Sequence, residues 1–258
     1  MVNFREALVS HYKDLEKATK TGFREIDAVG GFPKSKLIVV TGRPSCGKTS
    51  FALSVAYKAI KDDKRITFLT QQMTHEEICC RFVSFESGVP LQQVMYNPTW
   101  IESDNKAFNE AMALLENKGF QYFQDKQNAI VLEYLADMKT LDGMVIDSYQ
   151  MFNDYDFIYK LYKLAKEYGF WVMVVTDTDD IGRKFTNKRE LVAKDKLFQL
   201  ADMVIKVDNA PTDILEFGGG DPYGKGVIEI VKSRHTREFD FLCEYDRLTG
   251  RFTDSKNA

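Results

Sequence analysis

Long apolar runs are missing from this chain of 258 residues. A membrane-spanning helix needs about 20 consecutive apolar residues, and no stretch of the sequence approaches that length. Residues 1–20 carry charges at helical spacing rather than the apolar segment of a secretory signal. We therefore expect an intracellular protein that has no membrane segment.

Cysteine is also scarce, with 4 residues in the whole chain. Cys79 and Cys80 are adjacent, and neither they nor Cys46 and Cys243 show the paired spacing of a zinc site or a disulfide framework. We expect four reduced thiols that fill small or apolar positions.

An excess of positive charge is absent as well, because the chain has 35 Lys and Arg residues and 38 Asp and Glu residues. Without a global basic field, any contact with nucleic acid must be local and made through a few loops. Apolar residues make up 44% of the chain, which is enough for a sizeable core. The length suits one large α/β domain, and two small domains are not needed.

The most informative stretch that is present covers residues 37–50. The apolar run Leu37–Val40 predicts a strand, the spacing Gly42-x-x-x-x-Gly47-Lys48-Thr49 is that of a phosphate-binding loop, and a helical pattern follows. Glycines let the backbone N–H groups close around phosphate oxygens, and a helix N-terminus adds partial positive charge. We predict a nucleotide-binding loop formed by Gly42, Arg43, Pro44, Ser45, Cys46, Gly47, Lys48, Thr49 and Ser50.

Two side chains of this loop carry the expected chemistry. Lys48 should reach the β- and γ-phosphates of ATP, and the Thr49 hydroxyl should ligate Mg²⁺. A second anchor is the apolar strand Gly143–Asp147, whose final carboxylate would lie beside the same Mg²⁺. Many strands end in aspartate, but one that follows a phosphate loop in an alternating β/α chain is a more specific signal.

The remainder of the chain alternates between strand and helix patterns. Apolar runs predict strands at 66–70, 121–123, 171–176, 203–207, 226–232 and 239–245, and helical periodicity predicts helices at 3–19, 75–88, 104–117, 128–139 and 155–168. We expect an α/β fold with a mostly parallel central sheet flanked by helices and antiparallel strands at the C-terminal end. Residues 1–20 would be a linker-like helix, packed on the domain's own core or on a neighbouring subunit, and 21–258 the main domain.

Five motifs occur in order along the chain: Thr21-Gly22-Phe23-x-x-Ile26-Asp27, the loop at 43–49, Val145-Ile146-Asp147-Ser148-Tyr149-Gln150, the run at 199–205, and Lys232-Ser233-Arg234. In this order they resemble the C-terminal ATPase domain of DnaB-type replicative hexameric helicases. The ending is also similar to the phage primase-helicase branch. The resemblance runs from about residue 20 to the C-terminus. It implies a RecA-like P-loop NTPase fold, a six-membered ring, ATP bound between subunits, and translocation on single-stranded DNA.

The resemblance also implies roles for individual residues. Lys48 and Thr49 would hold phosphate and Mg²⁺, and Asp147 would belong to the Mg²⁺ shell. Lys232 and Arg234 match the pair that reaches from one subunit into its neighbour's γ-phosphate, a role worth roughly 10³–10⁵ in rate in related systems. The alternative for this pair is two exposed cations on an edge strand. The N-terminal helix matches a linker helix that docks on the adjacent subunit.

Two positions depart from the family pattern inside the expected site. Where the family places a glutamate that orients the attacking water, this chain has Gln72, and an amide cannot accept the proton. General-base catalysis is worth about 10²–10⁴-fold, so turnover should be slow unless Glu76 or another acid substitutes. The γ-phosphate sensor, usually Gln or His, corresponds to Asp177, whose carboxylate would repel the γ-phosphate unless Mg²⁺ or a lysine intervenes.

Contact with single-stranded DNA is expected from the polar loop that follows the predicted strand 171–176. Four cations would neutralise phosphates and one aromatic ring would be available for stacking: Arg183, Lys184, Lys188 and Arg189, with Phe185. Such a loop is usually only solvated. The segment 153–156 is acidic where a DNA-facing loop should be neutral or basic.

Together these patterns predict an ATP- and Mg²⁺-dependent replicative DNA helicase motor. It would act as a homo-oligomeric, hexameric ring in the cytoplasm of a bacterial or phage-infected cell, with a separate primase or helicase loader as partner. Two alternatives stay open. One is a catalytically degenerate, nucleotide-binding paralogue that serves as a helicase partner, loader or regulator, and the other is a different RecA-like DNA-dependent ATPase.

Overall fold

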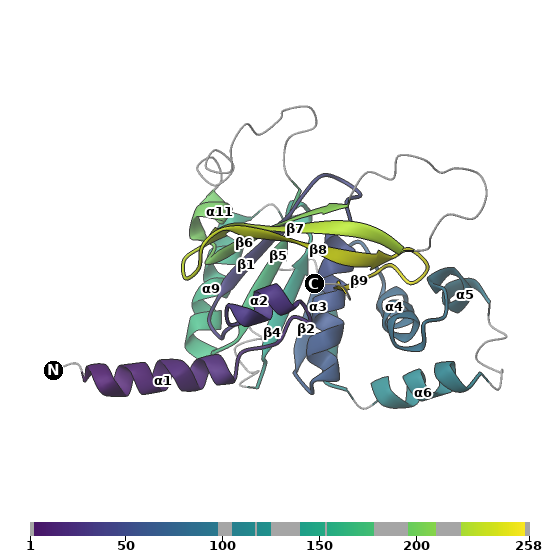
Figure 1. Cartoon of the computed structure of the whole chain (residues 1–258), viewed down its shortest axis with the longest axis horizontal. Coiled ribbons are helices and arrows are strands. Elements are labelled where there is room, and N and C mark those ends of the chain that lie inside the picture. The colour runs from purple at the N-terminus through teal and green to yellow at the C-terminus, as the bar shows by residue number, and fades with distance from the viewer. Residues whose placement is uncertain are drawn as a thin grey trace.

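The computed structural model describes residues 3–97, 105–116, 118–124, 140–152, 154–177, 196–209 and 223–255. Within these residues a nine-stranded sheet runs through the molecule in the order β3-β2-β4-β5-β1-β6-β7-β8-β9 (Figure 1). The strands are β1 Leu37–Thr41, β2 Ile66–Thr70, β3 Phe120–Phe123, β4 Gly143–Asp147, β5 Trp171–Val175, β6 Met203–Asn209, β7 Tyr223–Ser233, β8 Phe239–Asp246 and β9 Arg251–Asp254.

The sheet has a parallel part and an antiparallel part. The strands from β3 to β6 are parallel to one another, with β1 between β5 and β6. The strands from β6 to β9 pair antiparallel, as expected for the C-terminal end. Because parallel strands end at the same edge of a sheet, the residues that follow β1, β2, β4 and β5 are brought together there.

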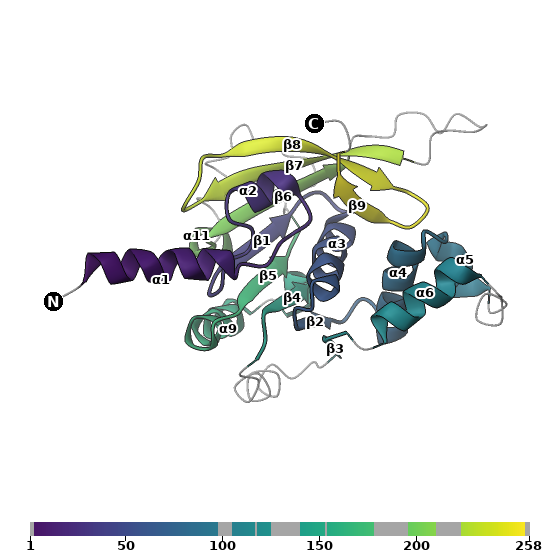
Figure 2. The same ribbon diagram turned by 60° about the horizontal axis from the view of Figure 1, so that its bottom comes forward.

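Helices cover both faces of the parallel strands (Figure 2). The described helices are α1 Phe4–Glu16, α2 Arg24–Ala28, α3 Lys48–Lys61, α4 His75–Ser87, α5 Leu91–Tyr96, α6 Lys106–Leu115, α8 Tyr149–Phe152, α9 Tyr155–Tyr168 and α11 Lys196–Leu200. None of these described helices combines the length and apolar character needed to cross a bilayer. One core cluster joins α3 to Ile38 and Val40, and the other joins α9 and α11 to Leu37 and Val39.

The central strands are buried at every position, which explains why they form continuous apolar runs in the sequence. Alternate residues of β1 point into opposite core clusters. Both faces of the sheet are therefore filled, and only the strand ends are free to build a site.

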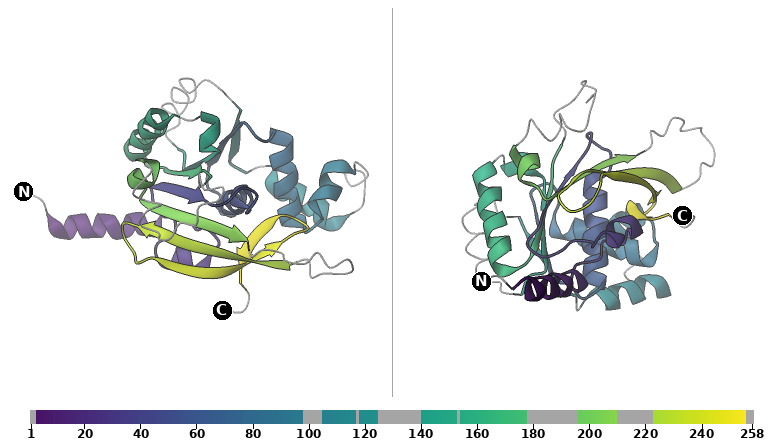
Figure 3. Two further views of the ribbon diagram at one scale, coloured as in Figure 1. Left: turned by 90° about the horizontal axis from the view of Figure 1, so that it is seen from above. Right: turned by 60° about the vertical axis from the view of Figure 1, so that its left-hand side comes forward.

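The helix α1 projects away from the rest of the domain (Figures 1 and 3). None of its residues is buried, and Phe4, Leu8 and Tyr12 are 80%, 55% and 61% exposed. The chain joins the body just after α1, where Thr19 pairs with Phe32 and its hydroxyl accepts from Trp171 Nε1 at 2.9 Å. Phe4, Leu8 and Tyr12 thus form an apolar stripe on α1 that this single chain leaves exposed.

Most predicted elements are confirmed, and β2, β4 and α9 have the predicted bounds. The antiparallel strand β7 begins at Tyr223, three positions before the predicted start. β9, α5, α8 and α11 were not predicted, because short elements carry too little periodicity to be recognised. The helix predicted at 128–139 lies outside the described residues.

The acidic segment 153–156 has a structural explanation. Asp154 caps α9, because its Oδ1 accepts a hydrogen bond from the Phe157 backbone N–H at 3.0 Å. Asp156 lies in the first turn of that helix, where a negative charge is favourable. Acidity at this point therefore belongs to the start of a helix and needs no role in binding.

Candidate nucleotide-binding site

The phosphate-binding loop connects β1 to the N-terminus of α3, as predicted. Gly47 caps α3 with φ of 95°, a conformation that glycine adopts without strain. A Cβ atom on Gly42 would lie 2.4 Å from the Val207 carbonyl oxygen, so only glycine fits between β1 and β6. The loop conformation therefore depends on both glycines of the motif.

The predicted loop residues divide into two groups. Arg43 Nη2 contacts Asp208 Oδ1 at 2.9 Å, and Cys46 Sγ donates to the Val207 carbonyl at 3.0 Å, so these side chains fasten the loop to β6. Burial raises the pKa of the Cys46 thiol, which keeps it protonated and unreactive. The loop residues that line the pocket are Pro44, Ser45, Gly47, Lys48, Thr49 and Ser50.

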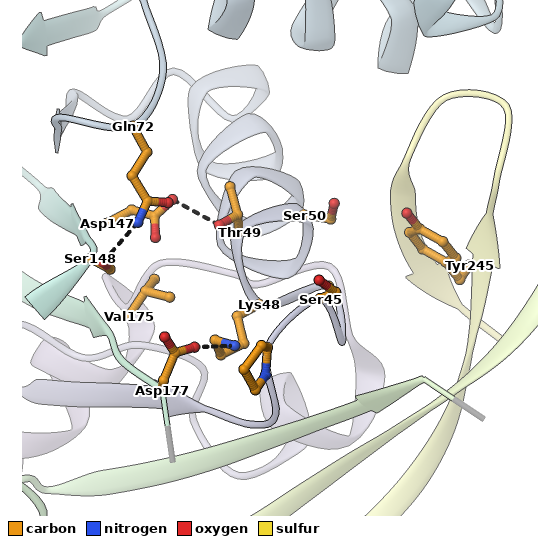
Figure 4. Close-up of a pocket in the computed structure, with 12 residues that line it drawn as sticks. Ser45, Lys48, Thr49, Ser50, Gln72, Asp147, Ser148, Val175, Asp177 and Tyr245 are labelled. Carbon is orange, nitrogen blue, oxygen red and sulfur yellow. Dashed lines mark hydrogen bonds and ion pairs between the residues drawn. The ribbon is translucent and has the colours of Figure 1, made fainter. Parts of the chain in front are cut away.

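Lys48 is buried, and its ammonium group has three acceptors around it, of which Figure 4 shows the Asp177 carboxylate. It donates to the carbonyl oxygens of Gly42 at 3.2 Å and Arg43 at 2.7 Å, and it forms an ion pair with Asp177 Oδ1 at 2.7 Å. Asp177 follows β5 at the same edge of the sheet. The structure thus brings the predicted lysine and the predicted sensor position into direct contact.

Thr49 and Asp147 meet at the base of the pocket. The Thr49 hydroxyl donates to Asp147 Oδ2 at 2.9 Å, and Asp147 is 1% exposed. Burial raises the pKa of Asp147 to about 6, while the hydrogen bond from Thr49 acts in the opposite direction. The Thr49 hydroxyl and the buried Asp147 carboxylate are two oxygen ligands that suit Mg²⁺. This ion binds few protein ligands and keeps waters and phosphates in its shell.

Gln72 follows β2 and lies across the pocket from the loop (Figure 4). Its Nε2 donates to the Ser148 hydroxyl at 3.0 Å, and its backbone N–H donates to Thr70 Oγ1 at 3.0 Å. Glu76, the acid considered as a substitute base, is exposed on α4 and is not among the residues that line the described pocket. Of these two side chains, the amide of Gln72 is therefore the one that lines the described pocket.

The pocket enclosed by these groups has a volume of about 380 Å³. Its lining comes from the ends of β1, β2, β4 and β5, and from one residue of β8 that the sequence analysis missed, Tyr245. The Tyr245 ring packs on Phe252 with a centroid distance of 4.6 Å and faces Ser50 across the opening (Figure 4). No motif marks this tyrosine, because it lies far along the chain from the loop.

Lys232 and Arg234 lie away from this pocket. Lys232 Nζ donates to the carbonyls of Phe198 and Gln199 at 2.8 Å each, at the C-terminal end of α11. Burial lowers the pKa of Lys232, and the neighbouring Arg234 acts in the same direction. α11 ends where β6 begins, at the opposite edge of the sheet from the loop. The two cations and the phosphate-binding loop are therefore separated by about the length of the five-residue strand β1, roughly 16 Å.

The remaining predicted contacts are those with single-stranded DNA. Arg183, Lys184, Phe185, Lys188 and Arg189 lie outside the described residues. Among the residues that are described, no group of three or more His, Cys, Asp or Glu side chains forms a metal cluster. All four cysteines are free thiols, as expected, and Cys46 and Cys243 are buried.

Fold and site together define a RecA-like P-loop nucleotide-binding domain. The model of the DnaB-like helicase C terminal domain family matches residues 18–176, which is more than half of the chain. The chain therefore belongs to this family. The match includes the loop, Gln72 and Asp147, and it ends before Asp177, Lys232 and Arg234.

Individual relatives agree with the family assignment. The replicative DNA helicase DnaC of Bacillus subtilis (strain 168) is 30% identical over 163 residues, a region of 57% of this chain and 36% of the helicase. The replicative DNA helicase DnaB of Geobacillus stearothermophilus is 29% identical over 163 residues, with the same shares of the two chains. This chain spans about a third of the length of these curated helicase relatives.

Solved structures show the same fold at lower sequence identity. One solved ATPase domain has a TM-score of 0.81 at 18% identity, and the match covers 99% of this chain and 100% of that domain. The structure of a DnaB-like replicative helicase and its interactions with primase gives a TM-score of 0.76 at 18% identity, covering 99% of this chain and 68% of that chain. The likeness therefore extends over the strands and helices beyond residue 176, where the family match ends.

Proposed function

We propose that this chain is the ATP-dependent motor domain of a replicative DNA helicase, acting in the cytoplasm of a bacterial or phage-infected cell. The observation that carries the proposal is the meeting of Lys48, Thr49 and Asp147 at the carboxyl ends of β1 and β4. A loop lysine, a hydroxyl and a buried carboxylate are the groups that hold the phosphates and Mg²⁺ of ATP. Membership of the DnaB-like family supports the helicase chemistry.

The residues of the site suit ATP and Mg²⁺ as the bound groups. The loop backbone and Lys48 would hold the phosphates, and Thr49 and Asp147 would hold the ion, which supplies charge neutralisation at the reacting phosphate. Tyr245 offers an aromatic face at the rim of the pocket for the base. The remaining catalytic positions, Gln72 and Asp177, would face the terminal phosphate.

We further propose that the ATP sites lie between subunits of a homo-oligomeric, six-membered ring. Two observations support this proposal. Lys232 and Arg234 lie at the wrong edge of the sheet to reach the pocket of their own chain, and α1 exposes an apolar stripe that one chain leaves uncovered. In a ring, the two cations would reach the pocket of a neighbouring subunit, and a neighbouring subunit would cover the apolar stripe of α1.

Single-stranded DNA is the proposed track, and residues 183–189 are the proposed contact. The four cations of this segment make affinity depend steeply on salt, because each phosphate that is neutralised releases counterions. A separate primase is the proposed partner, by analogy with the DnaB-like helicase whose structure shows interactions with primase.

The test is steady-state ATP hydrolysis with and without single-stranded DNA, together with strand separation on a forked duplex. We expect wild-type turnover that DNA stimulates and that Lys48→Ala abolishes. The matched control is Lys58→Ala on the same helix, which removes a surface ion pair with Asp62 away from the pocket. If the wild type binds nucleotide no better than Lys48→Ala does, the proposal is wrong.

A second candidate function is favoured by one observation: the pocket is lined by the amide of Gln72, where the family resemblance implies a glutamate. A chain with this feature could bind ATP in the ring without hydrolysing it and act as a partner, loader or regulator of an active helicase. Binding of ATP without turnover, in the presence of DNA, would support this second function. DNA-stimulated turnover by the wild type would exclude it.

A further inference from the structure

The ammonium group of Lys48 is fully engaged by the protein itself. A lysine side chain has three N–H donors, and the three acceptors around Lys48 are the carbonyls of Gly42 and Arg43 and the carboxylate of Asp177. A bound terminal phosphate requires a donor from the same ammonium group. One of the three acceptors must therefore give way.

The three acceptors differ in how easily they can leave. The carbonyls of Gly42 and Arg43 belong to a backbone fixed between β1, β6 and α3. The Asp177 side chain is 43% exposed, whereas that of Lys48 is 9% exposed. Asp177 can turn towards water without breaking the fold, so the carboxylate and the terminal phosphate compete for one donor.

The negative charge of Asp177 also acts within the pocket. Asp177 and Asp147 line the same pocket, from the ends of β5 and β4, and both carboxylates lie on one side of it (Figure 4). A phosphate group that arrives in this pocket meets the repulsion of both.

The effect should depend on the number of phosphates. The α- and β-phosphates lie in the cradle of backbone N–H groups and at the helix N-terminus, where the field is positive. The terminal phosphate of a triphosphate extends beyond that cradle towards Lys48 and its partner. A diphosphate can therefore bind with the Lys48–Asp177 pair less disturbed than a triphosphate.

We propose that Asp177 is a specificity-determining residue that biases this site towards nucleoside diphosphate and against the triphosphate. The inference rests on the nucleotide-binding function proposed above. Its carboxylate holds Lys48 in place of the terminal phosphate, and it must be displaced each time a triphosphate binds. A neutral side chain at this position would remove both the competition and the repulsion.

The experiment compares the affinities of ADP and of a non-hydrolysable ATP analogue, each with Mg²⁺, by isothermal titration calorimetry. Asp177→Asn keeps the shape of the side chain and removes its charge. We expect the ratio of the two dissociation constants, analogue over ADP, to fall by about ten-fold or more, because the repulsion acts at short range in a partly buried site. Asp177→Gln is the second variant, and it should shift the ratio in the same direction.

The matched control is Asp63→Asn. Asp63 forms a lysine–aspartate pair with Lys118 at 2.6 Å, close in length to the Lys48–Asp177 pair, beyond the opposite end of α3. This control should leave the ratio unchanged. An unchanged ratio in both Asp177 variants, or an equal gain for both nucleotides, would overturn the inference while leaving nucleotide binding intact. If the wild type binds neither nucleotide better than Lys48→Ala does, the proposed function itself fails.

Discussion

Arg234 donates from its Nη2 atom to the main-chain carbonyl of Leu200 at 3.0 Å. Leu200 is the last residue of α11, whose C-terminal carbonyls also accept from Lys232. Cations at a helix C-terminus are favourable because they satisfy free carbonyls and oppose the helix dipole. The two cations are thus held in a defined position at the sheet edge opposite to the pocket, where a neighbouring subunit could receive them.

Arg234→Ala should abolish most turnover while leaving nucleotide affinity little changed. The expected loss is roughly 10³-fold or more if Arg234 acts on the neighbour's terminal phosphate. Mixing Arg234→Ala with Lys48→Ala subunits should restore part of the activity, because some interfaces then combine an intact loop with an intact arginine. ATPase assays of the mixtures provide the measurement.

The control for the arginine is Lys206→Ala, which removes a surface cation paired with Glu229 at 3.6 Å on the adjacent strand. It should leave turnover close to that of the wild type. Mixtures without any recovery, measured on rings of confirmed size, would show that Arg234 does not act between subunits.

The apolar stripe of α1 predicts a contact between subunits. Leu8→Glu should shift the assembly to smaller species, because a charge would be buried against the neighbour. The melting temperature of the domain should stay unchanged, since α1 contributes no buried residue. Sedimentation velocity and circular dichroism measure the two effects. Ser10→Glu adds the same charge elsewhere on this exposed helix, and an equal loss of assembly in that variant would contradict the role of the stripe.

Much of the site could be predicted because its parts are local in sequence or fixed by topology. Gly42 to Thr49 form one continuous stretch, Asp147 is the last residue of β4, and Gln72 follows β2, and the ends of these strands must meet in a parallel sheet. The apolar runs of these strands were visible because both of their faces are buried. Motif spacing and the apolar runs of buried strands were therefore sufficient to predict that Lys48, Thr49 and Asp147 form the site.

The parts that could not be predicted depend on contacts between distant segments. Tyr245 reaches the pocket because β8 and β9 fold back beside α3, and no pattern in the sequence encodes that return. The pairing of Asp177 with Lys48 needs the relative position of two side chains rather than two strands. The docking of Lys232 and Arg234 on α11 was hidden because α11 has only five residues.

Asp147→Asn should stabilise the nucleotide-free protein at neutral pH. The folded pKa of about 6 exceeds the unfolded value of 3.8, so the folded state binds more protons between pH 4 and 6. The charge on Asp147 therefore lowers the free energy of unfolding progressively as pH rises through this window, and the full cost of roughly 3 kcal/mol is reached above it. The variant should gain that amount at pH 7.5 and almost nothing near pH 4.

Urea unfolding at the two pH values measures this difference. Asp240→Asn, an exposed carboxylate on β8, is the control and should change stability little at either pH. Asp147→Asn should also weaken Mg²⁺-dependent nucleotide binding, because the amide replaces a carboxylate ligand of the ion. The buried carboxylate thus lowers stability but serves function. A variant less stable than the wild type at pH 7.5 would show that burial does not govern this group.

Gln72→Glu should raise the rate of ATP hydrolysis. The new carboxylate would lie in the pocket at the end of β2 and could accept a proton from water, which the amide cannot do. General-base catalysis sets the expected gain at about 10²–10⁴-fold. Single-turnover hydrolysis with saturating Mg²⁺ isolates this step from product release. Gln71→Glu is the control, because it adds the same charge one residue away, outside the described pocket lining.

The direction of the change at Gln72 decides between two roles for the amide. If the variant is faster, the wild-type amide merely fills the place of a base and the chain binds ATP with little turnover. If the variant is slower than an active wild type, the amide itself must orient the water through the hydrogen bond that it shares with Ser148. Ser148→Ala would then lower the wild-type rate as well, because Gln72 would lose the acceptor that fixes its side chain.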